Sequence, residues 1–149
     1  LKSIIDECVA MLDPLIQKQK ITIQCIVSSS FFIKTDKTRF QQILLNVLSN
    51  AIKFSYSSGK IFIDVIFKQE VVYISITDYG GGISSDDLKR VFDPFVSILQ
   101  FDSIRGSGLG LAIAKQLTER LSGTIEMSSE GEGKGACVKL SFPQNLIEG

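Results

Sequence analysis

Apolar residues recur along this chain with two different periods, and the alternation between them predicts the order of its elements. The i, i+3, i+4, i+7 spacing typical of helices runs over 1–19, 37–54 and 107–122. Alternating or compact apolar runs predict strands at 21–27, 31–35, 61–67, 71–77, 124–128 and 136–142. Helices interspersed with strand pairs predict one α/β two-layer sandwich, with three helices on one face of a mixed, mainly antiparallel sheet of about five strands.

Turn and cap residues set the expected boundaries. Pro14 kinks the first helix or marks its restart with Asp13 as the cap, and Asp36 is expected to cap the second helix. Strands 21–27 and 31–35 are expected to pair around a serine turn. A short helix is predicted at 84–90 and a long loop at 91–106. The inward face of the third helix is expected to carry Leu109, Ala112, Ile113, Leu117 and Leu121.

Composition narrows the class of protein. The 149 residues suffice for one domain with a core, and 16 basic residues balance 16 acidic ones. Zero net charge argues against a nucleic acid or an anionic membrane as the main partner. No apolar run is long enough to span a bilayer, and three cysteines without metal-ligand spacing fit a reducing compartment. The first residue, Leu1, suggests a piece of a longer protein.

Two asparagines interrupt the apolar helix at 37–54. Asn46, Asn50 and Lys53 fall within an arc of roughly 60° when residues are placed at about 100° intervals. This arc borders the apolar face, so the three side chains are expected at the edge of the core, where a cleft would open. Because asparagine is a poor helix former, the stripe indicates either a ligand site or an ordinary solvated edge.

A carboxylate ends the strand predicted at 71–77. Asp78 falls on the apolar side of that strand, where a carboxylate is unfavourable unless a hydrogen-bond donor meets it. Gly80 and Gly82 follow and allow the backbone to approach a bound group closely. Adenine would fit, because its exocyclic amine can donate to the carboxylate. The alternative is an aspartate that opens a turn before glycines.

A glycine-rich segment, Arg105-Gly-Ser-Gly-Leu-Gly110, opens the third helix. Its backbone N–H groups and the helix N-terminus favour a phosphate chain, and a flexible turn is the alternative. The spacing is not that of a dinucleotide site, because the third glycine of that motif would fall at Leu111. Upstream, Phe92-Asp-Pro-Phe95 is expected to pin the long loop, a candidate lid, to the core.

Together these motifs resemble the catalytic ATP-binding domain of two-component sensor histidine kinases, in the GHKL superfamily. The match covers nearly the whole chain in order and spacing. The N, first glycine, F and second glycine boxes would be Asn46-x-x-x-Asn50, Asp78-x-Gly80-x-Gly82, Phe92-x-Pro94-Phe95 and Gly106-x-Gly108-x-Gly110. The resemblance implies the GHKL fold, with ATP between the helices and a lid at 91–106.

The resemblance also assigns roles to single positions. Asn50 would coordinate the Mg²⁺ that bridges the phosphates of ATP, while Asn46 and Lys53 would contact phosphate directly or through water. Asp78 would bind the adenine amine, and Arg105 is a candidate γ-phosphate contact. Asn46, Lys53 and Arg105 are therefore the catalytic candidates. Further nucleotide contacts are expected from Gly80, Gly82, Ile83, Phe95, Gly106, Ser107, Gly108, Leu109 and Gly110.

Two departures from the family matter. The family's phosphate-accepting histidine lies in a separate dimerisation domain, and this chain has no histidine, so it is expected to be the donor half. Residues 1–12 would then end the linker from the missing domain. The lid is also short and apolar, and it would fold over the nucleotide or dock on the missing domain. Its apolar residues are Val96, Ile98, Leu99 and Phe101.

The position of Asn46 separates the activities of the superfamily. In its gyrase, chaperone and anti-sigma-factor-related members this position is typically glutamate, a general base. Asparagine cannot accept a proton at neutral pH, so the resemblance favours histidine phosphorylation, in which positioning and charge neutralisation dominate. A GHKL ATPase and a nucleotide-binding regulatory module are the alternatives.

The resemblance implies partners as well. The expected partners are the histidine-bearing dimerisation domain of the same parent protein and the receiver domain of a response regulator. The fragment is expected to be monomeric and cytoplasmic. The parent protein would be a homodimer that is either cytoplasmic or anchored in a membrane.

Overall fold

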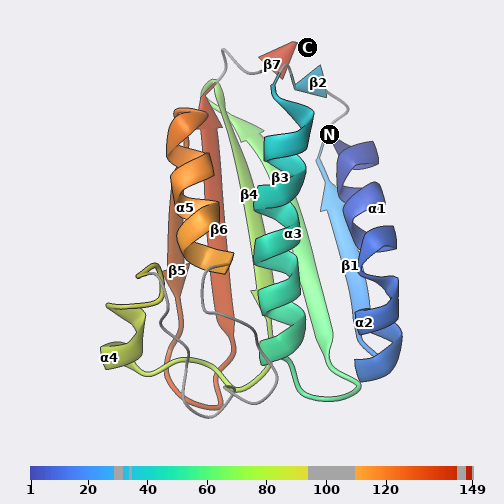
Figure 1. Cartoon of the computed structure of the whole chain (residues 1–149), viewed down its shortest axis with the longest axis vertical. Helices are drawn as coiled ribbons and strands as arrows, with labels where there is room; N and C mark the ends of the chain where they lie inside the picture. Colours follow the sequence, from blue (N-terminus) through green and yellow to red (C-terminus); the bar gives the residue numbers. More distant parts are fainter. Residues whose placement is uncertain (29–31, 34, 94–109, 144–146, 149) are drawn as a thin grey trace.

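The computed structural model describes all residues except 29–31, 34, 94–109, 144–146 and 149 (Figure 1). Its elements in chain order are α1 Lys2–Met11, α2 Asp13–Gln19, β1 Thr22–Val27, β2 Phe32–Ile33, α3 Lys37–Phe54, β3 Lys60–Lys68, β4 Val71–Asp78, α4 Ser85–Leu88, α5 Gly110–Arg120, β5 Thr124–Ser128, β6 Ala136–Pro143 and β7 Ile147–Glu148. In this part of the chain, no helix combines the length and the apolar character needed to cross a membrane.

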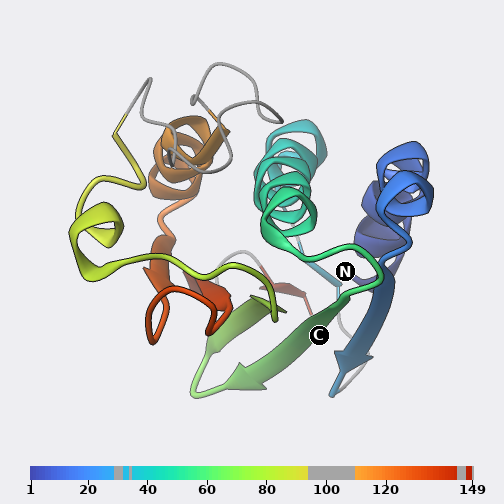
Figure 2. The same cartoon turned by 90° about the horizontal axis from the view of Figure 1, so that it is seen from below.

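The main sheet has five strands in the order β1-β3-β4-β6-β5. β1 pairs with β3 in parallel, and the other neighbours pair in antiparallel fashion. Helices α1, α2, α3 and α5 lie over one face of this sheet (Figure 2). This arrangement confirms the predicted two-layer sandwich and its mixed, mainly antiparallel sheet.

The core lies between the sheet and these helices. β4 alternates as predicted, so that Val72, Ile74, Ile76 and Asp78 are all buried on the side that faces the helices. The predicted apolar face of α3 is buried against them, and it comprises Phe40, Ile43, Leu44, Val47, Leu48 and Ala51. The alternation of β4 therefore carries a carboxylate into the edge of an apolar core.

Of the two helix caps predicted from the sequence, the structure confirms one and contradicts the other. The Asp36 carboxylate accepts a hydrogen bond from Arg39 N–H at 3.1 Å, which confirms it as the cap of α3. At the break between α1 and α2, however, Asp13 is not the cap: it is already helical, and Leu12 stands before it without a side-chain cap bond. Pro14 sits in the first turn of α2, where its missing N–H has no helical partner to lose.

The predicted pairing of 21–27 with 31–35 is wrong. β1 instead lies parallel to β3, with Thr22 opposite Lys60, and β2 forms a separate two-stranded sheet with β7. The connection from β1 to β3 runs through α3, as a parallel pair requires a crossover. Parallel pairing places β1 at the sheet edge, beneath α1 and α2, where its apolar residues reach the core.

The predicted inward face of α5 is partly wrong. Ala112 is buried as expected, but Ile113 is only half-buried and does not join the core, whereas Leu111, Ala114 and Thr118 are buried. A buried threonine is tolerated because its hydroxyl donates to the Ala114 carbonyl oxygen at 2.6 Å. Leu117 and Leu121 pack against the core as predicted, so the predicted inward face is wrong at Ile113 and incomplete at Leu111, Ala114 and Thr118.

A candidate nucleotide site at the end of β4

Asp78 is buried at the end of β4, with 3% of its surface exposed. Burial raises the pKa of its carboxyl to about 6, and hydrogen bonds from the backbone N–H groups of Gly80 and Ala136 partly offset this effect. The Gly80 N–H lies 3.0 Å from Asp78 Oδ1. The carboxyl is thus held by neutral donors in an apolar setting, where a further donor from a ligand would be favourable.

The glycine segment after Asp78 is bonded on two sides. On one side, Gly81 N–H donates to the carbonyl oxygen of Phe54, at the end of α3, at 3.1 Å. On the other side, Gly133 N–H donates to the Gly81 carbonyl at 2.7 Å and Gly135 N–H donates to the Gly80 carbonyl at 3.2 Å. The loop between β5 and β6 therefore holds the glycine segment in place through these two backbone hydrogen bonds.

The glycines of this segment are required by their surroundings. A Cβ atom at Gly80 would lie 2.1 Å from the Phe54 carbonyl oxygen. Gly82 has φ +66°, and a Cβ atom there would lie 2.1 Å from the Gly131 carbonyl oxygen. Only glycine allows the backbone to pass this close to both neighbours.

The polar stripe of α3 lies where the pattern predicts. Asn46, Asn50 and Lys53 are half-buried, next to the buried face of the helix. The amide nitrogen of Asn46 is buried and, among the described residues, has no hydrogen-bond partner. An unpartnered buried donor is unfavourable, and in a native structure it needs an explanation such as a ligand.

The N-terminus of α5 comes close to this stripe. A Cβ atom built on Gly110 would lie 3.9 Å from Asn46 Oδ1, so the last glycine of the second glycine box adjoins the first asparagine of the N box. Phe92 packs against the core, as expected of a residue that pins the start of the loop, and Lys115 Nζ lies 5.7 Å from its ring centroid. Several predicted site residues lie outside the described residues, namely Phe95, Arg105, Gly106, Ser107, Gly108 and Leu109.

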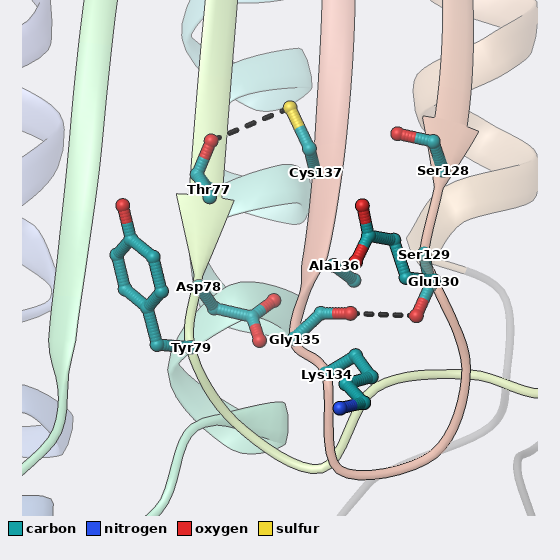
Figure 3. Close-up of a pocket in the computed structure, with 10 residues that line it drawn as sticks. All are labelled: Thr77, Asp78, Tyr79, Ser128, Ser129, Glu130, Lys134, Gly135, Ala136 and Cys137. Atoms are coloured by element: carbon teal, nitrogen blue, oxygen red, sulfur yellow. Dashed lines mark hydrogen bonds between the residues drawn. The ribbon is translucent and has the colours of Figure 1, made fainter.

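A pocket of about 400 Å³ adjoins Asp78, at the end of β4, the start of β6 and the β5–β6 loop (Figure 3). Figure 3 views the sheet with the helices behind the strands, and Thr77 and Cys137 project toward the viewer. The predicted phosphate contacts Asn46 and Asn50 are not among the described residues that line it. Its lining residues are Thr77, Asp78, Tyr79, Ser128, Ser129, Glu130, Lys134, Gly135, Ala136 and Cys137.

The sequence patterns missed the contribution of the β5–β6 loop. Ala136 N–H, Gly135 N–H and Gly133 N–H all support Asp78 or the glycines that follow it. The signal that could have found them is the alternating run Gly131-x-Gly133-x-Gly135, in which all three glycines have positive φ. The pattern predicts only a hairpin turn at this place.

Comparison with known proteins identifies the family. Residues 35–146 match the family described as histidine kinase-, DNA gyrase B- and HSP90-like ATPase. The chain is 37% identical over 116 residues to the sensor histidine kinase WalK of Bacillus subtilis, which covers 75% of this chain and 19% of WalK. The curated relatives are much longer, and the chain spans 14–27% of their length.

Two solved structures are similar over most of the chain. The mycobacterial sensor histidine kinase MprB has a TM-score of 0.83 at 26% identity, over 95% of this chain and 94% of that chain. Full-length ShkA in complex with AMPPNP has a TM-score of 0.81 at 30% identity, over 95% of this chain and 29% of that chain. The chain therefore belongs to the histidine kinase-, gyrase B- and HSP90-like ATPase family, in the form found in sensor histidine kinase catalytic domains.

Proposed function

We propose that this domain binds Mg-ATP and donates the γ-phosphoryl group to a histidine on a separate dimerisation domain, in two-component signal transduction. The observation that carries the proposal is the buried amide nitrogen of Asn46, which has no hydrogen-bond partner in the described part of the chain and lies beside the start of α5. A phosphate oxygen would supply the missing acceptor, and a helix N-terminus favours the same anion. The family and its named sensor kinases support a nucleotide in this position.

Asp78 would select the base. Its buried carboxyl accepts bonds from two backbone donors, and the exocyclic amine of adenine would add a third donor in an apolar setting. Gly80 and Gly82 would shape the base pocket by keeping the segment after Asp78 packed against Phe54 and the β5–β6 loop. The AMPPNP complex of ShkA supports a nucleotide ligand.

Asn50 fits the role of a Mg²⁺ ligand. It is half-buried one turn beyond Asn46 on the same side of α3. A single side-chain oxygen combined with phosphate oxygens and water suits Mg²⁺, which dehydrates reluctantly. When bound, Mg²⁺ would neutralise charge on the phosphates. Lys53 would contribute a second positive charge on the next turn, and the contacts from Arg105 and 106–110 complete the proposed phosphate site.

The choice of acceptor follows from Asn46 as well. An amide cannot take a proton from water, so a hydrolytic reaction lacks its base at this position, whereas an imidazole nitrogen needs none. The chain contains no histidine, so the acceptor must lie on another domain. We place that acceptor on the dimerisation domain of the same parent protein, with a response-regulator receiver domain as the next acceptor.

Phosphoryl transfer in trans tests the proposal. The domain is mixed with a histidine-bearing dimerisation domain and ATP labelled in the γ-phosphate, and label on the partner protein is measured over time. We expect label that depends on Mg²⁺ and that disappears when alanine replaces the partner's histidine. Tight ATP binding without transfer would favour a regulatory module, and steady phosphate release without partner would favour an ATPase.

A further inference from the structure

The hydroxyl of Ser129 joins backbone groups from two segments that are far apart in the sequence. It accepts hydrogen bonds from Ile83 N–H at 3.0 Å and Gly131 N–H at 3.2 Å. It donates to the Gly135 carbonyl oxygen at 2.6 Å, a bond that is drawn in Figure 3. Ile83 directly follows the glycine segment after Asp78, whereas Gly131 and Gly135 belong to the β5–β6 loop.

The bond to Gly135 acts on Asp78 through one peptide group. The carbonyl of Gly135 and the N–H of Ala136 belong to the same planar peptide, and the described chain has no cis peptide bond. In a trans peptide these two groups point in opposite directions. By holding the carbonyl, the Ser129 hydroxyl directs the Ala136 N–H toward the Asp78 carboxyl, which accepts its hydrogen bond.

The second donor to Asp78 is reached from the same loop. Gly135 N–H donates to the Gly80 carbonyl at 3.2 Å, and Gly80 N–H donates to Asp78 Oδ1 at 3.0 Å. The bond from Ile83 N–H to Ser129 fastens the far end of the glycine segment to this loop. Ser129 therefore orients the Ala136 donor through one peptide group, and the segment that carries the Gly80 donor is bonded to the same loop.

We propose that Ser129 is a positioning residue of the nucleotide site, which orients the Asp78 carboxyl toward the base. This inference rests on the proposed function, since Asp78 is its point of action. A serine hydroxyl can accept two hydrogen bonds and donate one, which matches the three bonds observed here, whereas alanine can make none of them. Ile83 is 1% exposed, so its N–H has little access to water as a substitute partner.

Three variants separate positioning from packing. Ser129→Ala removes the hydroxyl, Ser129→Thr retains it, and Ser128→Ala changes the exposed preceding residue, the last of β5. Calorimetry in Mg²⁺ gives the Kd of ATP and GTP for each. We expect Ser129→Ala to weaken ATP binding about tenfold and to lower the ATP-to-GTP preference. Ser129→Thr and Ser128→Ala should stay within about threefold of the parent domain.

One binding result would overturn the inference: an unchanged ATP-to-GTP preference in a folded Ser129→Ala variant, whether both nucleotides bind as before or both bind more weakly by the same factor. A parent domain that binds no ATP would instead refute the proposed function. In that case the pKa of Asp78, followed by NMR of its carboxyl carbon, tests the positioning without nucleotide. Weaker hydrogen bonds from the Gly80 and Ala136 N–H groups should raise this pKa further in Ser129→Ala, and an unchanged pKa would refute the role.

A variant of the same shape covers the case in which Ser129→Ala does not fold. Ser129→Cys keeps the unbranched shape of the side chain, with a larger terminal atom, and replaces the hydroxyl with a weak donor and acceptor. It should shift both the ATP-to-GTP preference and the pKa of Asp78 in the same directions as Ser129→Ala, to a smaller extent. Parent-like values for both quantities in Ser129→Cys would contradict the inference.

Discussion

The two ends of the proposed site are built in opposite ways. At the Asp78 end, a Cβ atom on Gly80 or Gly82 would lie 2.1 Å from a backbone carbonyl oxygen. At the α3–α5 end, a Cβ atom on Gly110 would meet, among the described residues, only Asn46 Oδ1 at an ordinary 3.9 Å, and Asn46 keeps an unpartnered amide nitrogen. We infer that the protein's own backbone completes the base-binding end, whereas the ligand completes the phosphate end.

The largest expected effect tests the first half of this comparison. Gly80→Ala forces a methyl group into the Phe54 carbonyl, so the variant should fail to fold or lose about 4 kcal/mol or more of unfolding free energy. Gly110→Ala is the matched control, because its methyl has room and alanine favours helix, and its stability should change by less than about 1 kcal/mol. Urea unfolding measures both. A Gly80→Ala domain as stable as the parent would break the comparison.

The next largest effect is the pH dependence of stability that the buried Asp78 carboxyl causes. Burial raises the pKa of Asp78 in the folded state to about 6, from 3.8, so the folded state holds its proton over a pH range in which the unfolded chain loses it. The protonated Asp78 carboxyl therefore makes its whole contribution to the free energy of unfolding below pH 3.8, and this contribution is lost as the pH rises to about 6. The total loss is about 3 kcal/mol.

Asp78→Asn removes this titration. Relative to the parent domain, the variant should become more stable by up to about 3 kcal/mol between pH 3.5 and pH 7. Urea unfolding of both proteins at a series of pH values measures the difference, and the other acidic groups cancel in the comparison. If Asp78→Asn and the parent domain differ in stability by the same amount at pH 3.5 and at pH 7, the pKa of Asp78 is not raised by folding, and the prediction is wrong.

At the phosphate end, Asn50→Ala should weaken binding without unfolding the domain. Loss of one ligand to a charged group predicts a fall in Mg-ATP affinity of about tenfold to a hundredfold. The melting temperature should stay within a few degrees of the parent value, because Asn50 is only half-buried. Calorimetry with Mg²⁺ and with a chelator isolates the metal, and an unchanged affinity in Mg²⁺ would count against the metal role.

The smallest expected effect sharpens the comparison at Asn46. Asn46→Ala removes a buried donor that has no partner among the described residues and improves helix propensity. Its unfolding free energy should stay equal or rise by up to about 1 kcal/mol, while ATP binding weakens. Leu48→Ala on the buried face of the same helix should instead cost about 2–5 kcal/mol. A comparable loss of stability in Asn46→Ala would show a structural role.

Local patterns predict the parts of this fold that depend on local order. The buried face of α3, the inward position of Asp78 and the cap at Asp36 all follow from spacing within one element. The pairing of β1 with β3 does not, because it joins strands across a whole helix. The burial of Thr118 was missed for a different reason, since its hydroxyl is satisfied inside its own helix.

The same division holds for the candidate site. The glycines after Asp78 are visible in the sequence, but their support from Ser129 joins residues 46 positions apart and leaves no periodic signal. The predicted roles of Lys53, Arg105 and the second glycine box stay predictions, as does that of Phe95. Composition also predicts no nucleic-acid partner, and that prediction is likewise open to test.

The preference for adenine tests the central claim most directly. Adenine presents an amine donor where guanine presents a carbonyl oxygen, so only adenine can donate to the Asp78 carboxyl at that place. Titration calorimetry of the parent domain with ATP and with GTP, in Mg²⁺, should give clear binding of ATP and much weaker binding of GTP. Asp78→Ala should remove the difference. Equal affinities of the parent domain for ATP and GTP would contradict the account.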